Sequence, residues 1–312
     1  MLKRRQDYQP PAFLVTSVYI SIDINDNVTD VTTKLNLYRN QDAAPGAALW
    51  LDGQDIELTR LTIDSADLPL GGDMPDQLSL CDKGLSVAGL GDEVVIEVQS
   101  QCYPQHNTAL EGLYLSGGMY CTQCEPEGFR RIGFFPDRPD VMSIFTVRIE
   151  ASQKFPQLLS NGNLIESGMA SSDRHYAIWR DPHPKPSYLF AAVVGDLDCV
   201  TSPYVTASGH KVDLKIYVEK GNADLTAHAM DSLIRSMRWD EQEYGLEYDL
   251  ELFQIVAVSH FNMGAMENKG LNIFNSKFVL ADTKIATDED LYRVESIVAH
   301  EYFHNWTGNR VT

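Results

Sequence analysis

The sequence has little cysteine, a shortage of basic residues and no long apolar run. Five cysteines among 312 residues are too few for the disulfide framework of a secreted scaffold. Lys and Arg number 25 against 44 Asp and Glu, and the net charge of −19 argues against nucleic acid or an anionic membrane as partner. No stretch approaches the roughly 20 apolar residues of a membrane span, and the basic start lacks a signal peptide's apolar run. We therefore expect a cytoplasmic protein.

The first part of the chain has the pattern of β-structure. Hydrophobic residues make up 44% of the sequence, enough to bury a core, and the length predicts about two domains. Apolar residues alternate over 18–24 and 31–37 around a turn cluster, which predicts a hairpin, and short strand patterns recur at 94–98, 145–149 and 188–194. No long amphipathic helix is expected before residue 220. We predict an all-β, sandwich-like N-terminal domain over residues 1–197.

The pattern changes in residues 198–312, where helical and strand periods mix. Apolar residues at 230, 233, 234 and 237 form one helix face, with Asn222 or Asp224 as the expected cap. Residues 252–258 and 274–280 are expected to form strands. A last helix should begin after Thr287, because three acidic residues follow it and favour the positive end of the helix dipole. We predict a mixed α and β second domain.

The last helix carries an H-E-x-x-H motif at residues 300–304. Two histidines four positions apart lie on the same helix face, so His300 and His304 can bind one zinc ion together. Glu301 is turned away from that face and can instead act as general base on a metal-bound water. The motif therefore predicts metal-assisted amide hydrolysis. A solvated helix that merely carries two histidines is the less favoured alternative.

A catalytic zinc ion ordinarily has three protein ligands. Residues 305–312 contain no Asp, Glu, His or Cys, so the third ligand must come from upstream or from beyond Thr312. We favour the second possibility. Cys121 and Cys124 lack the second Cys or His pair of a zinc knuckle, and we expect no metal site there.

Two motifs in order resemble those of the gluzincin aminopeptidases, and most of all the bacterial aminopeptidase N branch. One is Gly-Ala-Met-Glu-Asn at 264–268, and the other is His-Glu-Tyr-Phe-His-Asn-Trp at 300–306. Residues 121–130 and 135–140 also resemble that branch, so the resemblance covers essentially the whole chain. It implies an N-terminal β domain followed by the start of an α+β, thermolysin-like catalytic domain.

The resemblance also implies roles for individual residues. His300 and His304 would be zinc ligands and Glu301 the general base. Glu267 would bind the free α-amine of a peptide substrate, and the remaining substrate-binding residues would be Gln123, Glu125, Met263, Gly264 and Ala265. A buried carboxylate distinguishes a terminal ammonium from an internal amide, because a neutral group would leave its charge unpaired.

The family pattern places the third zinc ligand at about residue 323, beyond Thr312. We therefore expect an N-terminal fragment that binds zinc weakly, is inactive alone and has the remaining C-terminal part of the same enzyme as its partner. Two other functions stay open at this point. One is a zincin of the endopeptidase or epoxide-hydrolase type, and the other is a non-catalytic interaction module.

Overall fold

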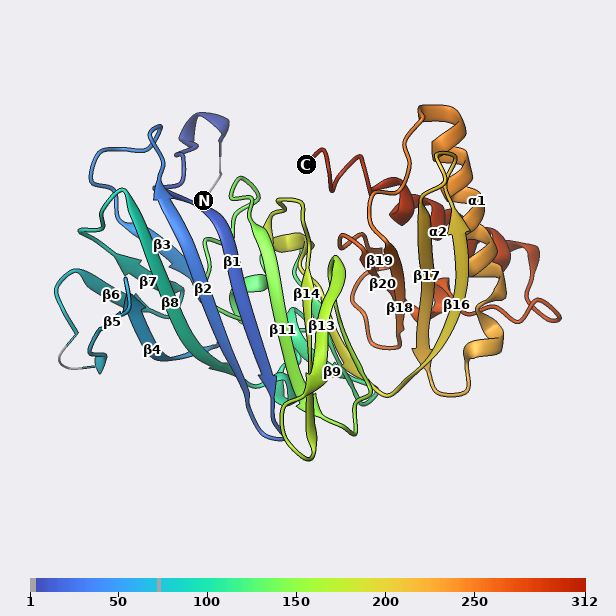
Figure 1. Ribbon diagram of the computed structural model, residues 1–312, viewed down its shortest axis with the longest axis horizontal. Helices are drawn as coiled ribbons and strands as arrows, with labels where there is room; N and C mark the ends of the chain where they lie inside the picture. Colours follow the sequence, from blue (N-terminus) through green and yellow to red (C-terminus); the bar gives the residue numbers. More distant parts are fainter. Residues whose placement is uncertain (1–3, 72–73) are drawn as a thin grey trace.

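The computed structural model describes residues 4–71 and 74–312 (Figure 1). The N-terminal part contains three sheets. The largest has eight strands in the order β13-β14-β11-β1-β2-β8-β4-β5. Their bounds are β1 Phe13–Ile24, β2 Thr29–Arg39, β4 Glu57–Ile63, β5 Ala66–Asp67, β8 Glu93–Cys102, β11 Ile144–Ser152, β13 Asn163–Met169 and β14 Arg174–Arg180.

Two smaller sheets complete this part. One, ordered β3-β7-β6, comprises Leu49–Asp52, Gly84–Val87 and Leu78–Cys81; the other, ordered β12-β15-β10-β9, comprises Gln157–Ser160, Ala192–Gly195, Met119–Gln123 and Gly112–Ser116. Short 3₁₀ turns lie at Arg5–Asp7, Pro104–His106, Phe129–Arg131 and Ser187–Leu189. Among the described residues no α-helix precedes residue 220. The prediction of a mostly-β N-terminal part is confirmed.

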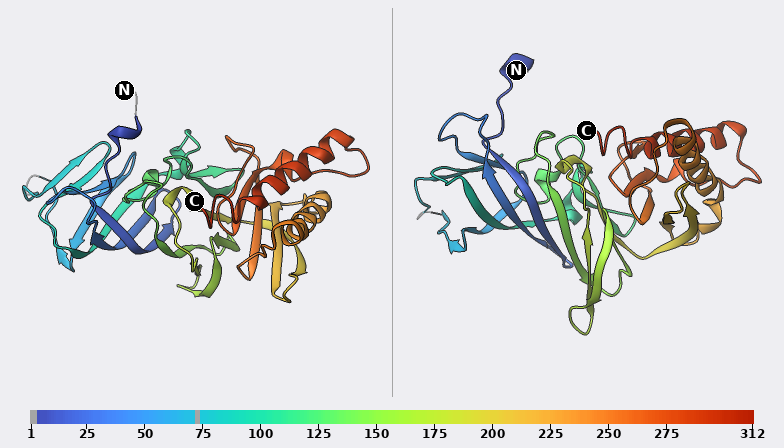
Figure 2. Two further views of the ribbon diagram at one scale, coloured as in Figure 1. Left: turned by 90° about the horizontal axis from the view of Figure 1, so that it is seen from above. Right: turned by 45° about the horizontal axis from the view of Figure 1, so that its top comes forward.

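The second part contains a five-stranded sheet covered by two helices. Its strand order is β16-β17-β18-β20-β19, with bounds Leu197–Val205, Lys211–Glu219, Leu252–Val258, Leu271–Asn275 and Ala265–Met266. The three central strands are parallel, whereas β16 and β19 are antiparallel edge strands. The helices α1 (Ala227–Tyr244) and α2 (Asp288–Phe303) lie side by side (Figures 1 and 2). The mixed α+β prediction is therefore confirmed.

The inner strands β18 and β20 of the five-stranded sheet are buried on both faces. Along β18, Phe253, Ile255 and Ala257 belong to the core that contains α1 and α2. The alternate residues Val256 and Val258 belong to the core of the N-terminal sheets. Successive strand residues point to opposite faces, so one strand contributes to both cores. The sheet thus lies between two apolar cores and contributes side chains to both.

Three predicted boundaries are wrong. Residues Ala223–Leu225 form a separate 3₁₀ turn, and α1 begins only at Ala227, after Thr226, whose hydroxyl donates to a carbonyl instead of capping the helix. The strand expected at 274–280 ends at Asn275, because that side chain accepts a hydrogen bond from the Lys277 amide and starts another 3₁₀ turn, Ser276–Phe278. The strand expected at 188–194 begins only at Ala192.

No helix among the described residues is both long and apolar enough to cross a membrane.

Helix α2 begins where the sequence predicts, after Thr287. The Thr287 hydroxyl accepts a hydrogen bond from the Asp290 amide at 3.2 Å, and the Asp290 carboxylate accepts from the Thr287 amide at 3.1 Å. This reciprocal capping box satisfies two backbone donors that a helix terminus otherwise leaves free.

We expect Thr287→Ala to lower the free energy of unfolding by about 1 kcal/mol, because the cap hydroxyl is lost. Urea unfolding followed by circular dichroism measures the change. Thr287→Ser keeps the hydroxyl and is the matched control. Equal stability of the Ala variant and the unsubstituted chain would show that the cap does not contribute.

Candidate active site

The two motif histidines converge at the end of α2. His300 Nε2 and His304 Nε2 are 3.0 Å apart. The Nδ1 of His304 lies 2.8 Å from the Thr307 carbonyl, which can only accept, so this nitrogen carries the proton. The lone pair of His304 is therefore on Nε2, the atom that faces His300. Two zinc-bound nitrogens in tetrahedral geometry would be separated by about 3.3 Å, so the pair fits one such ion.

Gly308 leaves room for the His304 ring. Its φ of 135° is accessible to glycine, and a Cβ at this position would lie 3.0 Å from His304 Nδ1. The turn that follows α2 thus has a residue whose lack of a side chain allows the histidine orientation.

Glu301 is buried next to this pair. Glu301 is only 6% exposed, and its Oε2 has no hydrogen-bond partner among the described residues. Burial, together with the charges of Glu267 and Glu125, raises the pKa of Glu301 to about 8 when the protein groups are considered alone. A bound cation would oppose this shift.

Glu267 comes to the same place from a different segment. A carboxylate oxygen of Glu267, one of Glu301 and a ring nitrogen of His304 lie within 4.8 Å of one another. Glu267 follows the short edge strand β19, whereas the other two lie on and just after α2. Tertiary packing thus brings together residues that are more than 30 positions apart in the sequence, and these three could hold a metal ion.

The N-terminal part contributes further polar groups. Glu125 is close enough to Glu267 and His304 for their charges to affect it, and its pKa is raised mainly by burial and then by Glu267. Gln123, at the end of β10, is almost fully buried and donates a hydrogen bond to Met263 Sδ at 3.1 Å. Its Oε1 has no partner in the described structure. The residues expected from the two parts of the chain therefore meet.

Gly264 and Ala265 lie at the edge of the five-stranded sheet. Ala265 pairs with Phe274 of β20, and the Gly264 carbonyl accepts from the Asn275 amide at 2.9 Å. Because β19 is the last strand of this sheet, its other side pairs with no strand within residues 4–71 and 74–312. An edge strand of this kind can pair with an extended peptide. Met263, which precedes it, is 40% exposed.

This arrangement has a defined chemical capacity. Two imidazoles can hold a divalent metal ion, and a buried carboxylate beside them can accept a proton from a metal-bound water. The additional carboxylates make the site strongly negative, which suits an ammonium group. The structure thus brings two imidazoles and three carboxyl groups together in one place.

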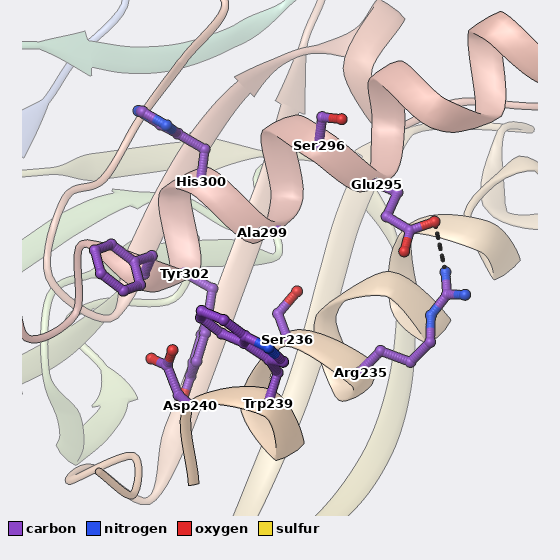
Figure 3. Close-up of a pocket in the computed structure, with 10 residues that line it drawn as sticks. Arg235, Ser236, Trp239, Asp240, Glu295, Ser296, Ala299, His300 and Tyr302 are labelled. Carbon is purple, nitrogen blue, oxygen red and sulfur yellow. Dashed lines mark ion pairs between the residues drawn. The ribbon is translucent and has the colours of Figure 1, made fainter. Parts of the chain in front are cut away.

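A separate cavity of about 560 Å³ lies between α1 and α2. It is lined in part by Trp239, Asp240 and Phe303, and His300 stands at its border. The His300 side chain nevertheless points away from Trp239 and Asp240 (Figure 3). The cavity is therefore a different place from the one where the histidines and carboxylates meet.

Sequence reasoning missed several residues that contact the site. Lys269 and Asn309 hold its loop, as described below. The partly buried Tyr188 lies near Glu267 and Glu125, whose charges help to raise its pKa after the larger effect of burial. Lys269 directly follows the 264–268 motif and Asn309 follows the 300–306 motif. Their closeness in sequence to the motifs was the available signal.

The comparisons with known proteins agree with this geometry. Residues 92–189 match the model of the Peptidase M1 N-terminal domain, and residues 228–312 match that of the Peptidase family M1 domain. The chain therefore belongs to peptidase family M1, and the predicted resemblance is confirmed.

Several relatives that are similar over nearly the whole chain are aminopeptidases. The chain is 49% identical over 306 residues to aminopeptidase N of Caulobacter vibrioides and 47% identical over 311 residues to that of Escherichia coli. These alignments cover 98% and 99% of this chain but 35% of each relative. Among solved structures, the crystal structure of Legionella pneumophila aminopeptidase A in complex with aspartic acid is similar, with a TM-score of 0.94 and 33% sequence identity. The match covers 99% of this chain and 36% of the Legionella chain. The chain thus spans about a third of these relatives.

We expect Glu301→Gln to raise the free energy of unfolding by about 1 kcal/mol in the presence of a chelator. At neutral pH a carboxyl with a folded-state pKa of about 8 must take up a proton on folding, which costs free energy, whereas an amide does not ionise. Urea unfolding at neutral pH measures the change. Glu243→Gln, on the exposed side of α1, is the matched control. A less stable Glu301→Gln variant would contradict the electrostatic account of this site.

Proposed function

We propose that this chain forms the metal-binding and amine-recognition part of an aminopeptidase, which removes N-terminal amino acids from peptides. The observation that carries this proposal is the meeting of the His300–His304 pair, Glu301 and Glu267 in one partly buried place. An endopeptidase needs the two histidines and Glu301. It has no use for a further carboxylate, such as that of Glu267, that receives a terminal ammonium. We also propose the division into 1–197 and 198–312, supported by the start of the five-stranded sheet at Leu197.

Zinc is the ion we propose. His300 and His304 would hold it through Nε2, and the family pattern places a third ligand at about residue 323. The relatives are long enough to include that position, since this chain spans 35% of them. When bound, zinc polarises the substrate carbonyl and lowers the pKa of a water molecule. Glu301 would take the proton from that water and pass it to the leaving amine.

The other carboxylates would select the substrate. Glu267 and Glu125 would receive the free α-amine, and the unpartnered Oε1 of the buried Gln123 offers a further acceptor. Met263 would contact the first side chain. The open edge of β19 at Gly264 and Ala265 would hold the peptide backbone in an extended conformation. A peptide with a blocked N-terminus would leave the acidic charges unpaired and would bind poorly.

The remaining C-terminal part of the enzyme is the proposed partner, and peptides with a free N-terminus are the proposed substrates. We also propose a cytoplasmic location. It is supported by the five cysteines, all of which are free thiols in the structure, because disulfides persist in oxidising compartments.

A direct test compares the 312-residue chain with a chimera in which the C-terminal remainder of the Caulobacter vibrioides relative follows Thr312. We expect the chimera to bind about one zinc ion and to release the amino acid from an aminoacyl p-nitroanilide, while the shorter chain binds zinc more weakly and releases none. Zinc is measured by atomic emission. Equal cleavage of free and N-acetylated substrates by the chimera would overturn the aminopeptidase proposal.

In the same chimera, Glu301→Gln should retain zinc and lose about 10²- to 10⁴-fold in kcat, the ordinary contribution of a general base. Steady-state kinetics and metal analysis together check this outcome. Glu243→Gln again serves as the control for removing one negative charge. A Glu301→Gln variant with unchanged kcat would exclude the role of this residue as the base.

Glu267→Ala should lower kcat/KM for free-amine substrates by about 100-fold, because the substrate ammonium loses a buried partner. The zinc content should change little. Glu289→Ala, an exposed substitution at the start of α2, is the control. Loss of zinc together with activity would instead assign Glu267 to the metal.

A further inference from the structure

Behind Glu267, a buried lysine connects its loop to the turn after α2. Lys269 is 2% exposed, and its Nζ donates to Asp249 Oδ1 at 2.5 Å and to Asn305 Oδ1 at 2.7 Å. Lys269 lies two residues after Glu267, and Asn305 directly follows His304. One side chain therefore links the segment of the amine-binding carboxylate to the segment of the metal-binding histidine.

A second hydrogen bond joins the same two segments. Asn309 Nδ2 donates to the backbone carbonyl of Glu267 at 2.8 Å, and Asn309 is almost fully buried. The Asn309 amide in turn donates to the His304 carbonyl at 3.0 Å. The backbone of Glu267 is thus held directly against the turn that positions His304.

One carboxylate, that of Asp249, pairs with both cations of this cluster. Asp249 accepts from Lys269 on one oxygen and pairs with Arg310 on the other. His183, which follows β14 of the N-terminal part, lies 3.4 Å from the same carboxylate. Removing one partner from such a cluster is costly, since the charge that remains is buried without compensation. The cluster consequently has a single well-defined arrangement.

The position of Glu267 needs such support. Its carboxylate lies near the carboxyl groups of Glu301 and Glu125, and its negative charge disfavours ionisation of both. Glu267 also follows β19, a two-residue strand held by one neighbour. Neither the short strand nor the local electrostatics would keep the carboxylate next to the histidines.

We propose that Lys269, together with Asp249, Asn305 and Asn309, is a positioning group that sets the distance between Glu267 and the His300–His304 pair. This inference rests on the proposed function and assigns to Lys269 an effect on substrate selection that is exerted only through Glu267. Lys269 itself contacts no substrate.

The test uses Lys269→Met. Methionine has a side chain of similar length but lacks the positive charge and the hydrogen bonds of lysine. The probes are leucine hydroxamate and N-acetyl-leucine hydroxamate, and their binding to the zinc-loaded chimera described above is measured by calorimetry. We expect the preference for the free amine to fall about tenfold, within the range of coupling between residues in one network. Lys284→Met, an exposed lysine, is the matched control and should leave the preference unchanged.

A double-mutant cycle separates positioning from general destabilisation. In a Glu267→Ala background, Lys269→Met should cause no further loss of preference, because the group through which it acts is already absent. An equal loss of affinity for both hydroxamates, or a further loss of preference in that background, would overturn the proposal.

Amide hydrogen exchange provides a measurement that needs no ligand. Lys269→Met should increase exchange in residues 264–268 and 304–309, while Lys284→Met should not. Unchanged exchange in both segments would also overturn the proposal. If the unsubstituted chimera shows no preference for the free amine, the proposed function fails instead, and exchange alone decides the role of Lys269. Should Lys269→Met not fold, Asn309→Ala removes one hydrogen bond without leaving a buried charge and should increase exchange in the same segments.

Discussion

The crowding of three carboxyl groups beside one pair of histidines is the constraint on which the rest of this structure depends. Glu125, Glu267 and Glu301 come from three separate segments and lie near the same pair of histidines. Like charges in a poorly solvated place separate unless the backbone holds them or a cation neutralises them. The site therefore combines an affinity for cations with a need for a rigid surrounding framework.

The five-stranded sheet supplies most of that framework. It packs against the N-terminal sheets on one face and against α1 and α2 on the other. Its edge strand β19 ends beside the carboxylates, and α2 presents His300 and Glu301 from the helical side. Because both cores meet in one sheet, Gln123 and Glu125 of the N-terminal part have a defined place relative to the motifs of the second part.

The stability of the site and its chemistry oppose each other. The unpartnered Glu301 oxygen and the raised pKa of this carboxyl are costs that a structural core would avoid. Buried acids with perturbed pKa values gather where proteins bind ions or transfer protons. The hydrogen bonds of Lys269 and Asn309 involve none of the reacting groups. This part of the network can therefore add rigidity without changing the chemistry.

Much of the secondary structure was predictable, because alternation and helical periodicity report which side of an element is buried. The start of α2 at Thr287 followed from its acidic first turn, and the convergence of His300 and His304 followed from helix geometry alone. The starts of α1, β15 and the end of β20 were not predictable, since Asn222–Leu225, Ser187–Leu189 and Asn275–Phe278 form local turns that periodicity does not report.

By itself, the sequence determined the local chemistry of this protein: two imidazoles one helical turn apart, an adjacent acid and a second acidic motif. Only the tertiary structure decided that Glu267 and Glu125 meet at those imidazoles, that Gln123 contacts Met263, and that Lys269 reaches Asn305 and Asp249. Spacing along a helix follows from covalent geometry and hydrogen bonding between near neighbours. Contacts between distant segments depend instead on how sheets and helices bury their apolar faces against one another, which no short stretch of sequence specifies.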